Sequence, residues 1–134
     1  MIDLETFVKH YLHAALWSSA DNDGTSLTEE YCIDDFSTES IEKAIKDCID
    51  FIALVNNLLT EAFELETGDY YQHQHQYGLV EMAGHDFWLT RAGHGVGFWD
   101  RNLGEIGDKL TKITKDNFRD LDLYVGDDNK LYFM

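Results

Sequence analysis

Ser37–Glu66 reads STESIEKAIKDCIDFIALVNNLLTEAFELE and predicts the longest helix of the chain. Its apolar side chains recur every three or four residues, as they do along one face of an α-helix. Ser37 or Thr38 can cap the first turn, and the acidic side chains that follow suit the positive end of the helix dipole. We therefore expect a helix from about residue 38 to 66. Its predicted buried stripe is Ile41, Ile45, Cys48, Ile52, Val55, Leu59 and Ala62.

Helical spacing also marks four other segments. Apolar side chains from Leu4 to Leu16 recur at helical intervals, so residues 3–18 are expected to form an amphipathic helix. Ser26-Leu-Thr-Glu29 has the spacing of a capping box and predicts a short helical turn. Residues 103–116 predict a further helix with lysines toward its C-terminal end. Residues 70–84 predict a helix that Gly84 ends, with an irregular segment as the alternative.

Two segments show the period of two that is typical of β-strands. Apolar and other side chains alternate on both sides of Arg91-Ala-Gly-His94, which predicts a β-hairpin with its turn there. Residues 121–133 predict a closing hairpin around Gly126-Asp-Asp-Asn129. The expected fold is α+β in a single domain, residues 1–134. An acidic helical N-terminal half of two or three helices should pack on a small antiparallel sheet of two β-hairpins.

The composition fits one globular domain with a hydrophobic core. The chain has 134 residues, of which 44% are hydrophobic and 13% aromatic, which is too rich for an acidic disordered tail. It has no run of about 18 apolar residues, and its acidic first residues are unlike a secretory signal, so we expect a cytoplasmic protein that does not bind a membrane. Cys32 and Cys48 lack the spacing of a zinc site, so two reduced thiols are expected.

The net charge is −16, and most of it lies in the first half of the sequence. Residues 1–70 contain 16 Asp or Glu against three Lys, whereas residues 71–134 contain 10 against seven Lys or Arg. Like charges at this density repel one another in a folded chain, so they serve either solubility or the attraction of a cationic partner. The same charge makes direct binding of nucleic acid unfavourable.

The chain resembles a family of small acidic proteins of tailed bacteriophages and prophages. The residues that carry the resemblance are Ala83–Arg101, AGHDFWLTRAGHGVGFWDR, together with ALWSS at 15–19, YCIDD at 31–35 and YVGDD at 124–128. In that family the predicted turn usually reads Arg-Asn-Gly-His, so Ala92 departs from the pattern. The resemblance implies a phage origin and expression in the cytoplasm of a bacterial host. It implies no particular activity.

The leading hypothesis is a non-enzymatic, phage-encoded protein that inhibits a host nucleic-acid-handling enzyme, such as a restriction or other defence complex. Carboxylates on successive helical turns lie about 5.4 Å apart, so a row of them can approximate the phosphate charges of duplex DNA. Such a surface would bind the basic groove of a host protein. A homodimer remains an open alternative to a monomer. The carboxylates predicted to bind the partner are Asp21, Asp23, Glu29, Glu30, Asp34, Asp35, Glu39, Glu42, Asp47 and Asp50.

Two alternative functions use the predicted hairpin, residues 84–101. In the first, the chain is a protein-interaction or accessory module, and its acidity serves only solubility. Its partner surface would consist of His85, Trp88, Arg91, His94 and Trp99. In the second, the chain is a small enzyme in which His85, Asp86 and His94 perform acid–base catalysis, because a hairpin can bring imidazoles and a carboxylate together.

Metal sites and cofactors are not expected. Ser19–Glu30 has the glycine and the final glutamate of an EF-hand calcium loop, but Ser19 replaces the first aspartate. A polar turn between helices is the alternative. His73 and His75 would share a face only if their segment were extended, and on a helix they point apart. The glycines near residue 95 do not match the spacing of a dinucleotide-binding loop.

Overall fold

The computed structural model describes residues 2–21, 23–93 and 96–134. Over these residues the chain forms five α-helices, three short 3-10 helices and one antiparallel pair of strands. The α-helices are α1 (Leu4–Ser18), α2 (Thr38–Glu64), α3 (Gly68–Tyr77), α4 (Leu79–Ala92) and α5 (Glu105–Asn117); the 3-10 helices are η1 (Leu27–Glu29), η2 (Ile33–Asp35) and η3 (Phe98–Asp100); the strands are β1 (Leu123–Val125) and β2 (Leu131–Phe133). The fold is therefore α+β, as the sequence predicts.

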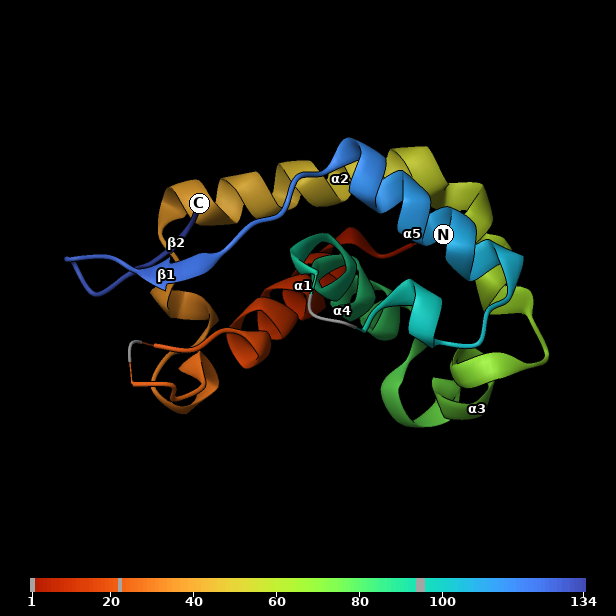
Figure 1. The fold of residues 1–134 in the computed structure, drawn as a ribbon, viewed down its shortest axis with the longest axis horizontal. Helices are drawn as coiled ribbons and strands as arrows, with labels where there is room; N and C mark the ends of the chain where they lie inside the picture. Colours follow the sequence, from red (N-terminus) through yellow and green to blue (C-terminus); the bar gives the residue numbers. More distant parts are fainter. Residues whose placement is uncertain (1, 22, 94–95) are drawn as a thin grey trace.

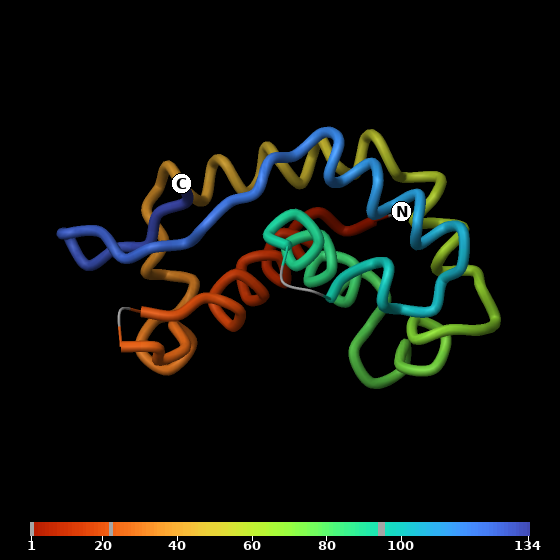
Figure 2. Tube along the Cα trace, viewed as in Figure 1, coloured from red at the N-terminus to blue at the C-terminus, as the bar shows by residue number. Residues whose placement is uncertain are grey.

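The helices form two layers. Helix α2 runs along the length of the molecule, and α5 lies against its C-terminal half (Figure 1). Helices α1 and α4 pack along each other beneath α2, and α3 lies at one end. The β1–β2 hairpin lies at the other end beside the start of α2, and the connection from α1 to α2 lies below it (Figure 2). The molecule thus has two ends that are built from different parts of the chain.

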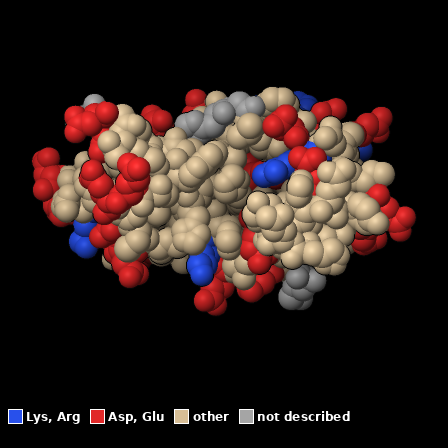
Figure 3. Space-filling model, turned by 90° about the horizontal axis from the view of Figure 1, so that it is seen from below, with Lys and Arg blue, Asp and Glu red and all other residues tan. Residues whose placement is uncertain are grey.

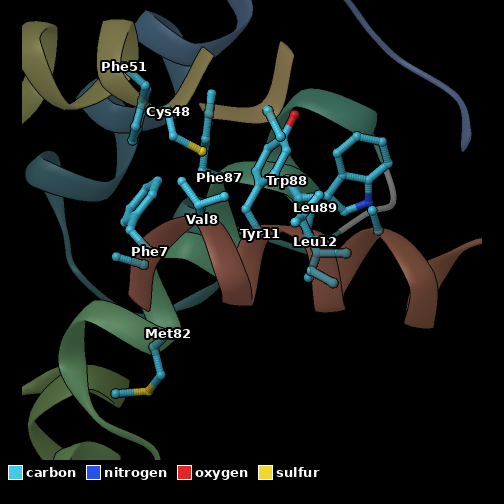
Figure 4. Packing of buried hydrophobic residues seen from close by; sticks show 14 of the residues in the cluster. Phe7, Val8, Tyr11, Leu12, Cys48, Phe51, Met82, Phe87, Trp88 and Leu89 are labelled. Carbon is cyan, nitrogen blue, oxygen red and sulfur yellow. The ribbon is translucent and has the colours of Figure 1, made fainter. Parts of the chain in front are cut away.

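Phe51 lies at the centre of the core, where α1, α2 and α4 meet (Figure 4). Its ring stacks on that of Phe87 with 3.9 Å between the ring centroids. The ring of Phe7, from α1, stacks on the Phe51 ring with 6.1 Å between the centroids, and all three side chains are fully buried. Each buried Phe contributes about 1.5–3 kcal/mol through the hydrophobic effect, so this cluster ties the two layers together.

The prediction of α2 is confirmed in extent and, at Cys48, Val55, Leu59 and Ala62, in its buried stripe, but not at Ile45. Ser37 caps the helix, because its Oγ accepts a hydrogen bond of 3.1 Å from the Ser40 N–H. The buried face centres on Phe51, whereas Ile45, which was predicted to be buried, is 38% exposed. The reason is that the aromatic cluster fixes the rotation of the helix, and the isoleucines lie to one side of it. The apolar residues that α2 buries are Ala44, Cys48, Phe51, Val55, Leu59 and Ala62.

The predicted hairpin at residues 84–101 is wrong. Its first strand belongs to α4, and residues 98–100 form the 3-10 helix η3. The expected turn is the C-terminal cap of α4, since Gly93 adopts the left-handed conformation (φ 73°) and donates hydrogen bonds to Leu89 O and Thr90 O. His94 and Gly95 lie outside the described residues. Helix α4 is buried on most of its circumference, so its sequence lacks the one-sided pattern that identifies an amphipathic helix.

Gly84 was predicted to end a helix. It lies instead within α4, at the contact with α1. A Cβ atom at this position would lie 2.4 Å from the Phe7 carbonyl oxygen. Glycine therefore allows the two helix backbones to approach closely. The helix predicted over residues 70–84 is in fact two helices, and Gly78 separates them with a φ of 82°.

The other predicted elements are confirmed. Helix α1 begins after Asp3, which accepts a hydrogen bond from the Glu5 N–H, and η1 lies at the predicted helical turn. Helix α5 covers the predicted segment, and the closing hairpin pairs Leu123 with Phe133 and Val125 with Leu131. No helix among the described residues is both long enough and apolar enough to cross a membrane.

Candidate functional site

Eight of the ten carboxylates predicted to bind a partner lie at one end of the molecule. They belong to the connection between α1 and α2, residues 20–36, and to the first turns of α2 (Figure 1). We call this group, together with the neighbouring tip of the β1–β2 hairpin, the acidic end. The six of the eight that are exposed are Asp23, Glu29, Glu30, Asp34, Glu39 and Glu42, while Asp21 and Asp35 are half-buried.

Asp21 and Asp35 hold the backbone of the acidic end in place. Asp21 Oδ1 accepts hydrogen bonds from the N–H groups of Asp23 (2.9 Å) and Thr25 (3.0 Å). Asp35 Oδ2 accepts one from the Cys32 N–H at 2.8 Å. These bonds satisfy backbone donors of an irregular segment, so the two carboxylates are structural as well as charged.

The hairpin tip adds two carboxylates that the sequence analysis did not assign to the site. Tyr31 OH donates a hydrogen bond of 3.0 Å to Asn129 Oδ1, which fastens the tip to the α1–α2 connection. Asp127 and Asp128 are exposed beside it. A hydrogen bond from Tyr132 OH lowers the pKa of Asp128 and raises the pKa of Tyr132 to about 12. The acidic end therefore combines segments about a hundred residues apart in the chain.

Asp47 and Asp50 do not belong to the acidic end, contrary to the prediction. Asp47 is 8% exposed, and its Oδ2 lies 2.7 Å from Arg91 Nη1 and 3.1 Å from Lys43 Nζ. Asp50 pairs with Lys46 one helical turn away, at 2.5 Å. Cations of the chain itself compensate both carboxylates, and burial keeps Asp47 out of reach of a partner.

The negative charge is not confined to one face of the molecule. A second group of exposed or half-buried carboxylates lies at the opposite end, around the C-terminus of α2 and the starts of α3 and α5. Figure 3 shows acidic side chains at both ends of the face seen from below and mostly uncharged side chains between them. The second group consists of Glu61, Glu64, Glu66, Asp69, Asp100 and Glu105.

The described residues of the alternative partner surface do not form a common exposed surface. Trp88 is fully buried, and its Nε1–H donates a hydrogen bond of 2.8 Å to Ser18 Oγ. Arg91 is 3% exposed, so it too is unavailable to a partner. His85 is half-buried and Trp99 is 49% exposed. His94 lies outside the described residues.

Arg91 instead organises a buried polar network. Its guanidinium donates hydrogen bonds to Asp47 Oδ2, to Tyr11 OH at 3.2 Å and to the Arg119 carbonyl oxygen at 2.9 Å. It also lies over the Phe118 ring, 5.3 Å from the ring centroid. Burial raises the pKa of the Tyr11 phenol well above its usual value. The network satisfies a buried charge and joins α1, α2 and α4 to the segment after α5.

Asp86 cannot serve as an exposed acid or base with His85. Its carboxylate is fully buried and accepts hydrogen bonds from Tyr70 OH at 2.6 Å and from Arg101 Nε and Nη2 at 2.9 and 2.8 Å. Burial raises the pKa of Tyr70 well above its usual value. His85 Nδ1 lies 3.9 Å from Asp86 Oδ1, which is beyond hydrogen-bond distance. Of the three residues proposed for catalysis, Asp86 therefore forms a structural ion pair with Arg101, and the His85 imidazole lies beside it.

The described residues give no support to either metal site considered above. In the ranges 2–21, 23–93 and 96–134 no three His, Cys, Asp or Glu side chains are placed to hold a metal ion. In the calcium-like loop, Ala20 forms an isolated β-bridge with Ser26, so the segment is a tight polar turn, while Asn22 lies outside the described residues. His73 and His75 lie on a helix, α3.

A cleft of about 470 Å³ lies between α1, α3 and α4. The cleft could not be predicted from the sequence, because His10 from α1 and Arg101 join the lining residues of α3 and α4 only through packing. Burial lowers the pKa of His10, and the neighbouring His13 lowers it further. His85 reaches toward Trp17, with 5.6 Å between the ring centroids. The cleft is lined by His10, His73, Tyr77, Glu81, Met82, His85 and Arg101.

No protein-family model, curated protein or solved structure matches the chain.

Proposed function

We propose that this protein is a non-enzymatic, phage-encoded inhibitor that binds the basic surface of a host nucleic-acid-handling enzyme through its acidic end. The phage origin follows the resemblance of the sequence, and the expected site of action is the cytoplasm of the bacterial host. The proposed partner is a restriction-type or other defence enzyme, whose DNA-binding groove is rich in Arg and Lys.

One observation carries this proposal: the α1–α2 connection and the start of α2, up to Glu42, contain no Lys or Arg that could compensate their carboxylates. Between Lys9 and Lys43 the sequence contains eight Asp or Glu and no Lys or Arg. Six of those carboxylates are exposed, and none of the eight forms an ion pair within the described residues. Such a field attracts a basic surface from a distance and speeds its association.

The arrangement also suits the imitation of DNA. Glu39 and Glu42 lie about one turn apart at the start of α2, and the loop and hairpin tip add further carboxylates beside them. Several anionic groups at intervals of a few ångströms can occupy successive phosphate positions of a DNA-binding groove. Because Asp21 and Asp35 are hydrogen-bonded to the backbone, part of the array is held in place before binding, which reduces the entropy lost on association.

The first test is capture of partners at two salt concentrations. Immobilised protein is exposed to bacterial lysate, washed with about 50 mM or about 500 mM NaCl, and the retained proteins are identified by mass spectrometry. Nucleic-acid-binding enzymes should be retained at low salt, released at high salt and displaced by added duplex DNA. Retention that resists both salt and DNA would contradict the proposal.

Two matched quadruple variants make the test specific. Asp23→Asn, Glu29→Gln, Glu30→Gln and Asp34→Asn neutralise the acidic end, whereas Glu61→Gln, Glu64→Gln, Glu66→Gln and Glu105→Gln remove the same charge at the opposite end. All eight side chains are exposed, so both variants should fold. Only the first should lose its partners. Equal loss in the two variants would show that net charge alone, and not the acidic end, causes retention.

A further inference from the structure

We propose that the cleft between α1, α3 and α4 binds an uncharged nucleobase or nucleoside. The site uses none of the carboxylates of the acidic end, so it is independent of the function proposed above. Its volume of about 470 Å³ lies within the range of about 300–1,000 Å³ that is usual for small-molecule pockets. Three properties of its lining support this ligand: flat rings, hydrogen-bond acceptors and charge.

Flat rings from three helices face the cleft. His10 comes from α1, His73 and Tyr77 come from α3, and His85 comes from α4. The rings of His73 and Tyr77 lie 6.1 Å apart, and Tyr77 is 57% exposed, so its phenol can move onto a ligand. Met82 adds a polarisable apolar contact at 5% exposure. Heteroaromatic bases stack on such side chains.

The polar lining of the cleft includes hydrogen-bond acceptors. Glu81 forms no ion pair within the described part of the chain, and its carboxylate offers two acceptor oxygens. His85 Nδ1 is buried without a hydrogen-bond partner and lies nearest to the Asp86 carboxylate, whereas the His85 side chain is 32% exposed. A neutral imidazole has one acceptor nitrogen, which His85 can offer to a ligand. The cleft therefore fits a ligand rich in N–H donors.

Charge disfavours phosphorylated ligands of the same size. Arg101 uses Nε and Nη2 on Asp86, so its positive charge is already balanced and offers little to a phosphate. Glu81 and a net charge of −16 repel a phosphorylated ligand. An uncharged heterocycle avoids this repulsion.

The edge of guanine matches Glu81 best among the common bases. Guanine carries a ring N–H and an amino group side by side, and a carboxylate accepts both in two parallel hydrogen bonds. Adenine and cytosine lack this pair of adjacent donors. We therefore expect guanosine to bind more tightly than adenosine or cytidine, and more tightly than guanosine monophosphate, which brings two negative charges.

The test is a titration of the purified full-length protein with guanosine, adenosine, cytidine and guanosine monophosphate. Binding is followed by Trp fluorescence, because Trp17 lies against His85, and by NMR of the imidazole resonances. Guanosine should produce a saturable change in His10, His73 and His85. If no nucleoside produces one at millimolar concentration, or if the monophosphate binds at least as tightly as guanosine, the proposal is overturned.

Three variants distinguish the cleft from other surfaces. Glu81→Gln should weaken guanosine binding about tenfold or more, because it removes a charged hydrogen-bond acceptor. Tyr77→Leu should weaken every nucleoside through loss of stacking, and the exposure of Tyr77 makes misfolding unexpected. Glu105→Gln makes the same change as Glu81→Gln at an exposed carboxylate outside the cleft lining and should have no effect. Unchanged guanosine binding in Glu81→Gln would overturn the proposal.

Discussion

Asp86 is a single residue that was a candidate for catalysis and instead stabilises the fold. Its carboxylate is fully buried between Tyr70 and Arg101. Asp86→Ala removes the partner of a guanidinium that is only 25% exposed and leaves a buried phenol without an acceptor. We expect the free energy of unfolding to fall by about 3–5 kcal/mol, as is usual when one side of a buried pair is removed. Urea denaturation followed by Trp fluorescence measures the change.

A matched control for Asp86 is Asp116, which forms an ion pair on the surface. Its carboxylate lies 2.9 Å from Lys112 Nζ, and both side chains are exposed. Water and salt screen such a pair, so Asp116→Ala should leave the urea midpoint almost unchanged. If the two substitutions had equal effects, Asp86 would not be the structural anchor that its hydrogen bonds indicate.

At the scale of the element, the rotation of α2 is open to a direct test. Periodicity alone buries Ile45, whereas the structure buries Phe51 and leaves Ile45 38% exposed. Phe51→Ala opens a cavity inside the aromatic cluster and should lower the free energy of unfolding by about 3–5 kcal/mol. Ile45→Ala removes a half-exposed side chain and should cost less than about 1 kcal/mol. A larger loss from Ile45→Ala than from Phe51→Ala in urea denaturation would mean that the helix faces the other way.

Elements with one exposed face could be predicted, and those without one could not. Helices α1, α2 and α5 present a polar face to water, so their apolar residues recur at helical spacing, and Gly126–Asn129 marks the closing hairpin. Helix α4 is buried on most sides, and even Asp86 and Arg91 are inside. Because burial no longer distinguishes one face of α4 from the other, its apolar residues do not recur at helical spacing and can be mistaken for the period of two of a strand.

At the scale of the whole molecule, sequence position predicts local charge but not long-range pairing. The absence of Lys and Arg between residues 9 and 43 leaves the carboxylates of the α1–α2 connection without compensation from their own segment. Asp47 seemed equivalent until the fold placed Arg91, 44 residues later, against it. The cleft was invisible in the sequence for the same reason, since His10, His73 and Glu81 meet only after three helices have packed.

The histidines that lie on or beside that cleft should make the stability of the whole molecule depend on pH. Burial lowers the pKa of His10 and of His13, whose rings lie 5.5 Å apart; His13 lowers the pKa of His10 further, and the charge of Lys9 lowers the pKa of both. In the unfolded chain both imidazoles return to a pKa of about 6.5. The unfolded state therefore binds more protons than the folded state once the pH falls to this value. Stability is then lost as the pH decreases further through the lowered pKa values of the folded state.

The expected outcome is a urea midpoint that decreases between about pH 7 and about pH 5, a range in which ordinary Asp and Glu side chains remain ionised. The double substitution His10→Gln and His13→Gln should flatten that decrease, because glutamine keeps a polar side chain but cannot take up the proton. The control is His75→Gln, since His75 is exposed on α3 and outside the cleft lining. A slope that the double substitution leaves as steep as in the wild type would assign the pH dependence to other groups, whereas a flattened slope would tie the protonation of this neighbourhood to the packing of α1 against α4.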